Sequence, residues 1–244
     1  MSLGIIVQAR LGSTRLPNKI ILPIESNNTF LDVLLSKLKE NFRNIPIILA
    51  TSKNSENSIL EEYAQKYEIN FYRGDEYNVL KRFVDCAREY KIKSIIRICS
   101  DNPFLDVDSL KSLISLYGNQ DYYSYKVNSI PAILTHYGFF AEIVSLVSLE
   151  KVLLLNNKNC LEHVTNCIYM NPDEFDVKFE EISIKEDYIR CTLDTKLDFQ
   201  NLKTLYFQWY KGGNDISLKS LISFVQRKGE LKKLMKQEIL NNRK

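Results

Sequence analysis

The chain has 244 residues, of which 45% are hydrophobic and 26% are charged, a balance that is typical of a globular protein and excludes a largely disordered one. Its 33 basic and 30 acidic residues give a formal net charge of +3, which is too even to predict binding to nucleic acid. It contains no run of 18 apolar residues and begins without the basic and long apolar segments of a signal peptide, so we expect no membrane association.

The five cysteines predict the redox environment. Cys86, Cys99, Cys160, Cys167 and Cys191 are odd in number and show no CxxC spacing. This pattern favours buried, reduced thiols over a disulfide or zinc framework. Together with the N-terminal sequence, it predicts a cytoplasmic protein.

Predicted strands and helices alternate along the first half of the chain. The apolar spacing predicts strands at 4–7, 45–50, 69–72 and 94–99, and helices at 30–42, 55–67, 78–90 and 106–117. Thr29 is the expected N-cap of the first helix. This alternation predicts an α/β fold, a doubly wound and mostly parallel sheet with helices on both faces. Ligands of such sheets bind beyond the carboxyl ends of the strands.

The second half is more mixed. We expect strands at 121–127, 138–144, 175–184 and 188–193, and helices at 149–155, 161–169, 197–210 and 218–241, with a break at 211–213. No repeat or linker interrupts the chain, so we predict one domain, 1–244, with a C-terminal helical segment from about 214 to 244. Residues 227–244 are rich in lysine and arginine. They indicate mainly a solvated helical tail, and binding of an acidic partner is the alternative.

A basic loop follows the first predicted strand. It contains three cations, two hydroxyls, a glycine and a proline: Arg10, Arg15, Lys19, Ser13, Thr14, Gly12 and Pro17. A triphosphate needs several donors and positive charges in a small volume, and glycine lets the backbone approach closely. The loop is neither a Walker A motif nor GxGxxG. We predict phosphate binding, and a solvated basic loop is the alternative.

Two aspartates end predicted strands. Asp101 follows the strand at 94–99, and Asp194 follows the strand at 188–193. Carboxylates at one sheet edge can share a hard cation, so we predict that both bind Mg²⁺. The alternatives are that Asp101 caps a turn before Pro103 and that Asp194 caps a helix.

Weaker candidates lie near the same edge. Ala50, Thr51 and Ser52 follow the second strand and are placed to contact a base or ribose. Gly74 and Arg82 follow the third strand and are placed to reach a nucleotide. An equal alternative is that the acidic residues next to Gly74 only start the following helix.

Several segments, in their order, resemble the SpsF-type cytidylyltransferases of polysaccharide biosynthesis. They are more distantly similar to the deoxy-octulosonate and acylneuraminate cytidylyltransferases. Residues 6–19 (IVQARLGSTRLPNK) resemble the QARxxSxRLPGK signature of the family. The resemblance continues at 73–83, 97–103, 162–165 and 190–195, and so covers nearly the whole chain.

The resemblance implies a nucleotide-diphospho-sugar transferase fold (GT-A-like, Rossmann-like), CTP as donor, and pairing of two chains in a homodimer. It implies Mg²⁺ binding by Asp101 and Asp194. Motifs and resemblance together predict catalytic roles for Arg10, Lys19 and Asp101. They predict nucleotide binding by Gln8, Ala9, Arg10, Gly12, Ser13, Arg15, Lys19, Ala50, Thr51, Ser52, Arg73, Gly74, Arg82 and Ser100. Glu142, His163 and Arg190 are the predicted acceptor contacts.

The chain departs from the family pattern at three places. Asn18 stands where the loop usually has glycine, and asparagine also tolerates left-handed backbone angles. Asn102 replaces the cysteine of Gly-Asp-Cys-Pro. The run at 135–141 differs from the usual Gly-Leu-Asp-Val-Glu, which leaves the acceptor open.

The predicted reaction is transfer of CMP from CTP to a small acceptor, a sugar acid or a sugar-phosphate-like molecule, with release of pyrophosphate, for the biosynthesis of surface polysaccharide. Three alternatives remain. One is a GT-A-type glycosyltransferase that uses a nucleotide-sugar, the second is a nucleotidyltransferase for another base, and the third is a non-catalytic nucleotide-binding module.

Overall fold

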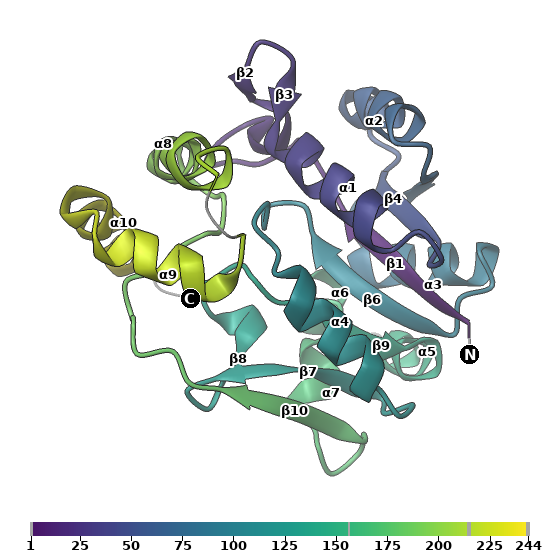
Figure 1. Ribbon diagram of the computed structural model, residues 1–244. Helices are drawn as coiled ribbons and strands as arrows, with labels where there is room; N and C mark the ends of the chain where they lie inside the picture. The colour runs from purple at the N-terminus through teal and green to yellow at the C-terminus, as the bar shows by residue number, and fades with distance from the viewer. Residues whose placement is uncertain (1, 156, 214–215, 243–244) are drawn as a thin grey trace.

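An eight-stranded sheet forms the centre of the computed structural model, which describes residues 2–155, 157–213 and 216–242 (Figure 1). Along the sheet the strands are β10 (Val177–Ile182), β7 (Tyr122–Val127), β9 (Glu142–Ser145), β6 (Ser94–Cys99), β1 (Leu3–Gln8), β4 (Ile47–Ser52) and β5 (Asn70–Gly74), and β8 (Ile130–Pro131) pairs with β7. β1 is parallel to β4 and β6, β4 to β5, and β7 to β10, whereas β9 runs antiparallel to both of its neighbours and β8 antiparallel to β7. The predicted α/β fold with a mostly parallel central sheet is therefore confirmed.

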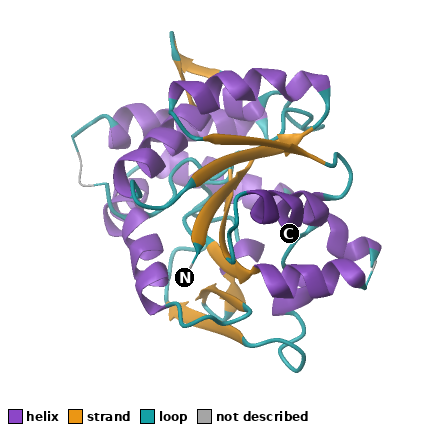
Figure 2. Ribbon diagram, turned by 90° about the vertical axis from the view of Figure 1, so that its right-hand side faces the viewer, coloured by secondary structure: helices purple, strands orange, loops and turns teal. Residues whose placement is uncertain are grey.

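Helices cover both faces of this sheet (Figure 2). They are α1 (Phe30–Asn41), α2 (Leu60–Lys66), α3 (Val79–Glu89), α4 (Val107–Leu116), α5 (Leu146–Leu154), α6 (Lys158–Glu162), α7 (Asn166–Tyr169), α8 (Lys196–Leu205), α9 (Leu218–Gln226) and α10 (Gly229–Asn241). Short turns of 3₁₀-helix lie at η1 (Lys19–Ile21), η2 (Ser55–Ile59) and η3 (Ala132–Leu134), and the π-helical turn η4 (Tyr206–Tyr210) follows α8. No described helix is long and apolar enough to cross a membrane.

The core has two parts, one on each face of the sheet. Successive side chains of a strand point to opposite faces, so Ile5 and Val7 of β1 join one cluster and Ile6 joins the other. The first cluster takes in the buried faces of α1, α2, α4, α8, α9 and α10. The second takes in those of α3, α5, α6 and α7. β1 is thus buried on both sides, which explains its continuous apolar sequence.

Local signals set several helix ends. Thr29 caps α1 as predicted, and it forms a capping box with Asp32. Asp32 also accepts hydrogen bonds from Lys66 Nζ at 2.7 Å and from the Tyr67 hydroxyl at 2.9 Å. These bonds fix α1 to the end of α2. Between the basic loop and α1 lies the hairpin of β2 (Pro23–Glu25) and β3 (Asn28–Thr29), which the sequence pattern had not indicated.

The second half departs from prediction at several points. The predicted strand at 188–193 is wrong, because that segment forms only isolated backbone bonds, from Cys191 to His136 and from Leu193 to Asp101. The strand expected at 138–144 begins only at Glu142. The helices expected at 55–67, 161–169, 197–210 and 218–241 each divide into two elements. Apolar spacing continues across these breaks, which is why periodicity alone misses them.

The C-terminal segment predicted from about 214 to 244 consists mainly of α9 and α10; residues 214, 215, 243 and 244 lie outside the described residues. The basic stretch that begins at residue 227 is more than the predicted solvated tail. Leu231 and Met235 are buried in the first core cluster. Its basic side chains, such as Lys232 and Lys236, are exposed as predicted.

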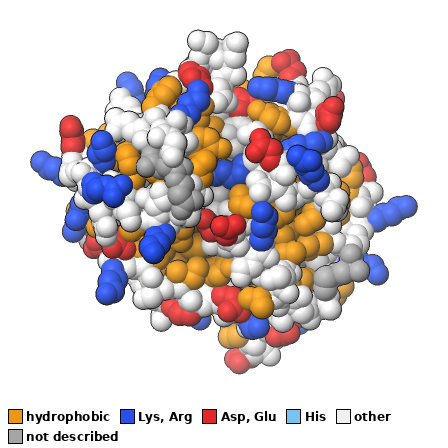
Figure 3. Space-filling view, in the orientation of Figure 1, with side chains coloured by type: hydrophobic (Ala, Val, Ile, Leu, Met, Phe, Trp, Pro, Cys, Tyr) orange, Lys and Arg blue, Asp and Glu red, His pale blue; other side chains and the backbone are white. Residues whose placement is uncertain are grey.

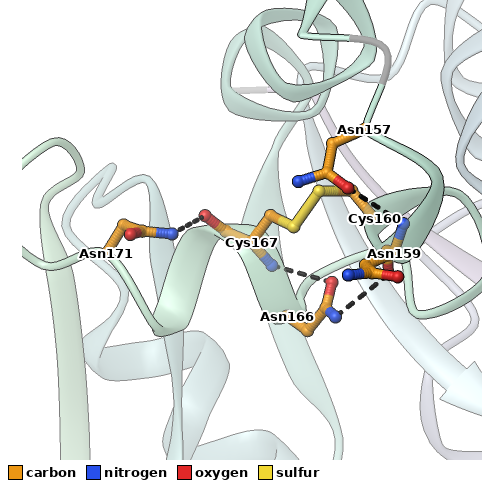
Figure 4. Close-up of a disulfide and its surroundings, with 6 residues drawn as sticks. All are labelled: Asn157, Asn159, Cys160, Asn166, Cys167 and Asn171. Atoms are coloured by element: carbon orange, nitrogen blue, oxygen red, sulfur yellow. Dashed lines mark hydrogen bonds between the residues drawn. A yellow bond between two sulfur atoms is a disulfide. The ribbon is translucent and has the colours of Figure 1, made fainter.

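The prediction of reduced cysteines is wrong for one pair. Cys160 and Cys167 form a disulfide between α6 and α7 (Figure 4). The α-carbons lie 5.7 Å apart, within the usual range for such a bridge. The intervening turn brings them together, and their spacing of seven residues matched no simple motif. Cys86, Cys99 and Cys191 take no part in this bridge.

Thiol counting tests this pairing. In denaturant without reductant, we expect three of the five cysteines to react with a maleimide, because a disulfide sulfur has no thiolate to attack the reagent. After reduction all five should react, as counted by intact mass. The Cys160→Ser/Cys167→Ser variant is the control and should give three under both conditions. Five reactive thiols in the unreduced protein would contradict the pairing.

Candidate nucleotide-binding site

A cleft of about 370 Å³ opens at the carboxyl ends of β1 and β6. Its lining comes from the basic loop, from the end of β6 and from the segment before α8: Gln8, Arg10, Gly12, Ser13, Thr14, Arg15, Lys19, Cys99, Ser100, Asp101 and Asp194. The edge predicted to bind ligand therefore does contain a cleft. It brings together the three predicted catalytic residues, both predicted metal ligands and most of the predicted phosphate contacts.

Lys19 lies at the centre of the charged residues in this cleft. Its Nζ is 2.9 Å from Asp101 Oδ2 and 2.9 Å from Asp194 Oδ1. Arg15 Nη2 lies 3.1 Å from the same Asp194 oxygen. Burial lowers the pKa of Lys19, but the two carboxylates outweigh burial and raise that pKa above its ordinary value. Lys19 is therefore a cation at neutral pH.

Asp194 is held in its ionised form by the same groups. Burial raises the pKa of Asp194, but Lys19, then Arg15 and Arg190, outweigh burial and lower that pKa below its ordinary value. A depressed carboxyl pKa stabilises the fold at neutral pH, and this contribution is lost as the pH falls through the folded-state pKa. The ion pair of Asp194 with Lys19 therefore persists until the pH drops below the ordinary range of aspartate, about 4.

The backbone of the basic loop explains its sequence. Asn18 adopts left-handed angles, with φ 57°, at the position where the family signature has glycine. Its N–H donates to the carbonyl of Leu11 at 3.0 Å, which closes the loop. Leu11 and Ile20 are buried and anchor the two ends. Asn18 thus keeps the backbone turn that places Lys19 over the aspartates.

A second network fixes Asp194. Asp198 Oδ2 accepts hydrogen bonds from the backbone N–H groups of Asp194 and Thr195, each with an N···O distance of 3.0 Å. Asp198 also accepts Nε and Nη2 of Arg190 at 2.6 and 2.8 Å, and Arg190 lies 3.5 Å from Asp194. Arg190 is only 1% exposed. It holds the end of its segment in place, and it does not line the cleft as an acceptor contact.

The other predicted acceptor residues also lie elsewhere. Glu142 is 2% exposed and forms a buried ion pair with Arg97. It accepts further hydrogen bonds from the hydroxyls of Tyr122 and Thr165 at 2.5 and 3.0 Å. His163 is exposed at the end of α6. None of the predicted acceptor residues lines the cleft. Glu142 and Arg190 are buried in ion pairs, and His163 lies on the turn after α6.

Arg97 is a residue whose role the sequence did not indicate. Besides Glu142, it donates to Gln8 Oε1 at 3.2 Å, and Gln8 lines the cleft. Its position inside an apolar strand is the signal that was available, because a buried arginine requires a carboxylate partner.

The predicted base and ribose contacts lie at the same sheet edge but outside the cleft lining. Ala50 and Thr51 are fully buried, and Ser52 Oγ accepts from Asn57. Arg73 donates to the carbonyls of Lys53 and Asn54. Three further predicted contacts bond to backbone groups. The Ala9 N–H donates to the Ala50 carbonyl, and the Gly74 carbonyl accepts from the Lys53 N–H. The Arg82 guanidinium donates to the carbonyls of Asp75 and Glu76.

A smaller cavity of about 110 Å³ adjoins the cleft and shares Cys99, Asp101 and Asp194 with it. Asn102 and Thr192 also line this cavity. Asn102 Oδ1 and Thr192 Oγ1 are buried and have no hydrogen-bond partner among the described residues. Sequence motifs included both residues, but nothing distinguished them from their neighbours.

The Arg190 network makes a testable prediction. Arg190→Gln leaves Asp198 buried without its cation, so we expect the free energy of unfolding to fall by about 3 kcal/mol in urea. The control is Arg88→Gln, which breaks the exposed pair with Glu150 and should cost less than about 1 kcal/mol. A stable Arg190→Gln variant with only a raised acceptor KM would instead support an acceptor contact.

The sequence of the chain is similar to those of known proteins. A family model described as cytidylyltransferase matches residues 4–210. The spore coat polysaccharide biosynthesis protein SpsF of Bacillus subtilis (strain 168) is 33% identical over 234 residues, covering 91% of this chain and 93% of that protein. The resemblance to the SpsF-type cytidylyltransferases is thereby confirmed.

Solved structures agree. A cytidylyltransferase from Leptospira borgpetersenii serovar Hardjo-bovis (strain JB197) is 27% identical with a TM-score of 0.81, over 95% of this chain and 96% of that one. CMP:2-keto-3-deoxy-manno-octonic acid synthetase, solved with CTP, has a TM-score of 0.64 over 85% and 99% of the two chains. At 14% identity, that second likeness concerns the fold alone. On these matches, the chain belongs to the cytidylyltransferase family.

Proposed function

We propose that this protein transfers CMP from CTP to a sugar acid or sugar-phosphate-like acceptor and releases pyrophosphate. The observation that carries the proposal is the cleft in which Lys19 is flanked by Asp101 and Asp194 beneath a loop with two further cations. The match to the cytidylyltransferase family model supports CTP as donor, and the likeness to the octonic acid synthetase, solved with CTP, is consistent with the GT-A-like fold that we propose. The printed role of SpsF supports a place in polysaccharide biosynthesis. The homodimer and the cytoplasmic location stay predictions.

The chemistry follows from the charges around the cleft. An acceptor oxygen attacks the α-phosphorus and forms a P–O bond, and the bond to the β-phosphate oxygen breaks. Pyrophosphate leaves with that electron pair, and an acceptor hydroxyl proton passes to solvent. Positioning and charge stabilisation dominate such transfers. Arg10, Arg15 and Lys19 supply positive charge to the phosphates, and Gly12 and Ser13 lie where a phosphate would approach the backbone.

Asp101 and Asp194 are the proposed ligands of Mg²⁺. They suit this ion because both are carboxylates beside the phosphate loop. No group of three or more His, Cys, Asp or Glu side chains positioned to hold a metal occurs among the described residues. Phosphate oxygens and water would therefore complete the coordination. When bound, the ion would neutralise phosphate charge. Lys19 now bridges both aspartates, so it would have to release them.

The acceptor is proposed to enter the cavity that adjoins the cleft. Asp101 and Asp194 border both spaces, so a molecule there lies next to the phosphates. The polar residues Asn102 and Thr192 line it on one side, and Phe140 adds an apolar surface suited to a sugar ring. We prefer this cavity to the acceptor residues predicted from the sequence.

Pyrophosphate release tests the reaction. Incubated with each of the four nucleoside triphosphates, Mg²⁺ and a panel of sugar acids and sugar phosphates, the protein should release pyrophosphate from CTP fastest. Lys19→Met and Asp101→Asn should each lower kcat by about 100-fold or more, because each removes transition-state charge stabilisation. Lys93→Gln, an exposed lysine at the other end of β6, is the control. If no triphosphate is cleaved and Asp101→Ala leaves nucleotide binding unchanged, the proposal fails.

Metal binding without nucleotide tests the role of Lys19. Because its ammonium neutralises both carboxylates, we expect weak Mn²⁺ binding to the nucleotide-free protein. Lys19→Met should raise that affinity by about tenfold or more, since it removes a nearby positive charge. Electron paramagnetic resonance of free Mn²⁺ measures this without turnover. Equal affinities in wild type and Lys19→Met would exclude competition between lysine and metal, and Lys93→Gln should match wild type.

A further inference from the structure

A second polar cleft lies away from the catalytic edge, between the end of α8 and the turn that joins α9 to α10. Its volume is about 520 Å³, and it shares no lining residue with the catalytic cleft. Asn201 and Thr204 line it from α8, and Arg227, Lys228, Gly229 and Glu230 from the turn. We call it the α10 cleft.

The first turn of α10 lines this cleft, and the Gly229 and Glu230 amides donate no hydrogen bond to any described residue. The helix is 13 residues long, and its N-cap residue, Lys228, provides no side-chain cap. The first backbone bond of the helix is from Lys232 N–H to Lys228 carbonyl at 2.9 Å. The amides before it lie at the positive end of the helix dipole. An anion is the ligand that such an end binds.

An independent observation from α8 points to the same chemistry. Asn201 is 3% exposed, and its side-chain nitrogen is buried without a hydrogen-bond partner in the described part of the chain. A buried donor left unpaired destabilises the folded state by about 1–3 kcal/mol. Asn201 also lines the α10 cleft, so an acceptor oxygen bound against it there would pair with this nitrogen. Two separate elements, α8 and α10, therefore place unpaired donors beside one cleft.

The charges of the lining also favour an anion. Arg227 and Lys228 are exposed cations, and Glu230 is the one acid among the lining residues. Figure 3 shows several basic side chains on the side of the molecule where α9 and α10 lie. Two basic residues of this stretch, Arg227 and Lys228, thus lie at the α10 cleft.

We propose that the α10 cleft binds a phosphate group. The backbone amides of Gly229 and Glu230 and the Asn201 amide would donate to its oxygens, and Arg227 and Lys228 would neutralise its charge. The space exceeds the size of a free phosphate ion, so the organic part of a phosphate ester also fits. This site does not depend on the proposed CMP transfer.

The two helices beside this cleft, α8 and α10, also reach the catalytic edge. Glu238 of α10 accepts a hydrogen bond from the Thr195 hydroxyl at 2.5 Å, next to Asp194. Near the end of α10, Asn242 accepts from Arg15 at 3.4 Å. A phosphate bound at the start of α10 therefore contacts a helix whose other end bears on the catalytic loop.

Amide chemical shifts of the full-length protein test the proposal. At constant ionic strength, ¹H–¹⁵N spectra are recorded against inorganic phosphate and, separately, glycerol 3-phosphate. We expect saturable shifts of the Gly229 and Glu230 amides and of the Asn201 side-chain amide. Arg227→Gln/Lys228→Gln should weaken binding at least about tenfold, because it removes both cations. Lys233→Gln/Lys236→Gln makes the same charge change on exposed positions outside the lining and should change affinity less than about twofold.

The outcomes separate this site from the catalytic one. Tighter binding of the ester identifies an esterified ligand, and equal binding identifies the free ion. Shifts that do not saturate, or that are the same in both double variants, overturn the proposal. Because Arg227 and Lys228 are exposed, the first double variant should fold, and its dispersed spectrum verifies this. Loss of CMP transfer would not affect these shifts.

Discussion

The ion cluster of Lys19, Asp101 and Asp194 is the interaction on which the functional edge depends. Asp101 lies 82 residues and Asp194 175 residues beyond Lys19, and each lies 2.9 Å from the same ammonium. Two carboxylates in one partly buried place repel each other unless a cation lies between them. The lysine therefore ties the loop after β1 to the end of β6 and to the segment before α8.

Buried ion pairs hold the surroundings of this cluster rigid. Arg190 with Asp198 fixes the backbone of Asp194, and Arg97 with Glu142 supports Gln8. A buried charge whose partner is removed destabilises a fold by several kcal/mol. Charged residues that look catalytic in the sequence thus divide into two groups, those that line the cleft and those that position the cleft residues from behind.

The C-terminal helices extend this support. Thr195 binds Glu238 of α10, and Arg15 binds Asn242 at the end of the same helix. The apolar faces of α9 and α10 are buried in the first core cluster. α10 is therefore part of the structure that shapes the catalytic edge, and its first turn carries the α10 cleft. One helix therefore connects the catalytic edge with the α10 cleft.

The sequence by itself determined the alternation of strands and helices, the Thr29 cap and the basic loop, because apolar periodicity, capping and turn residues act over a few neighbouring positions. It also predicted that Lys19 and Asp101 would lie at one edge, since parallel strands bring their carboxyl ends together. Asp194 lies at the same edge, although the strand from which its place was predicted does not form. Only the tertiary structure decided that Glu142 and Arg190 are buried in ion pairs, that 188–193 is no strand, and that Cys160 meets Cys167. Those outcomes depend on which distant segments pack together, and burial and pairing are properties of that packing that no local pattern contains.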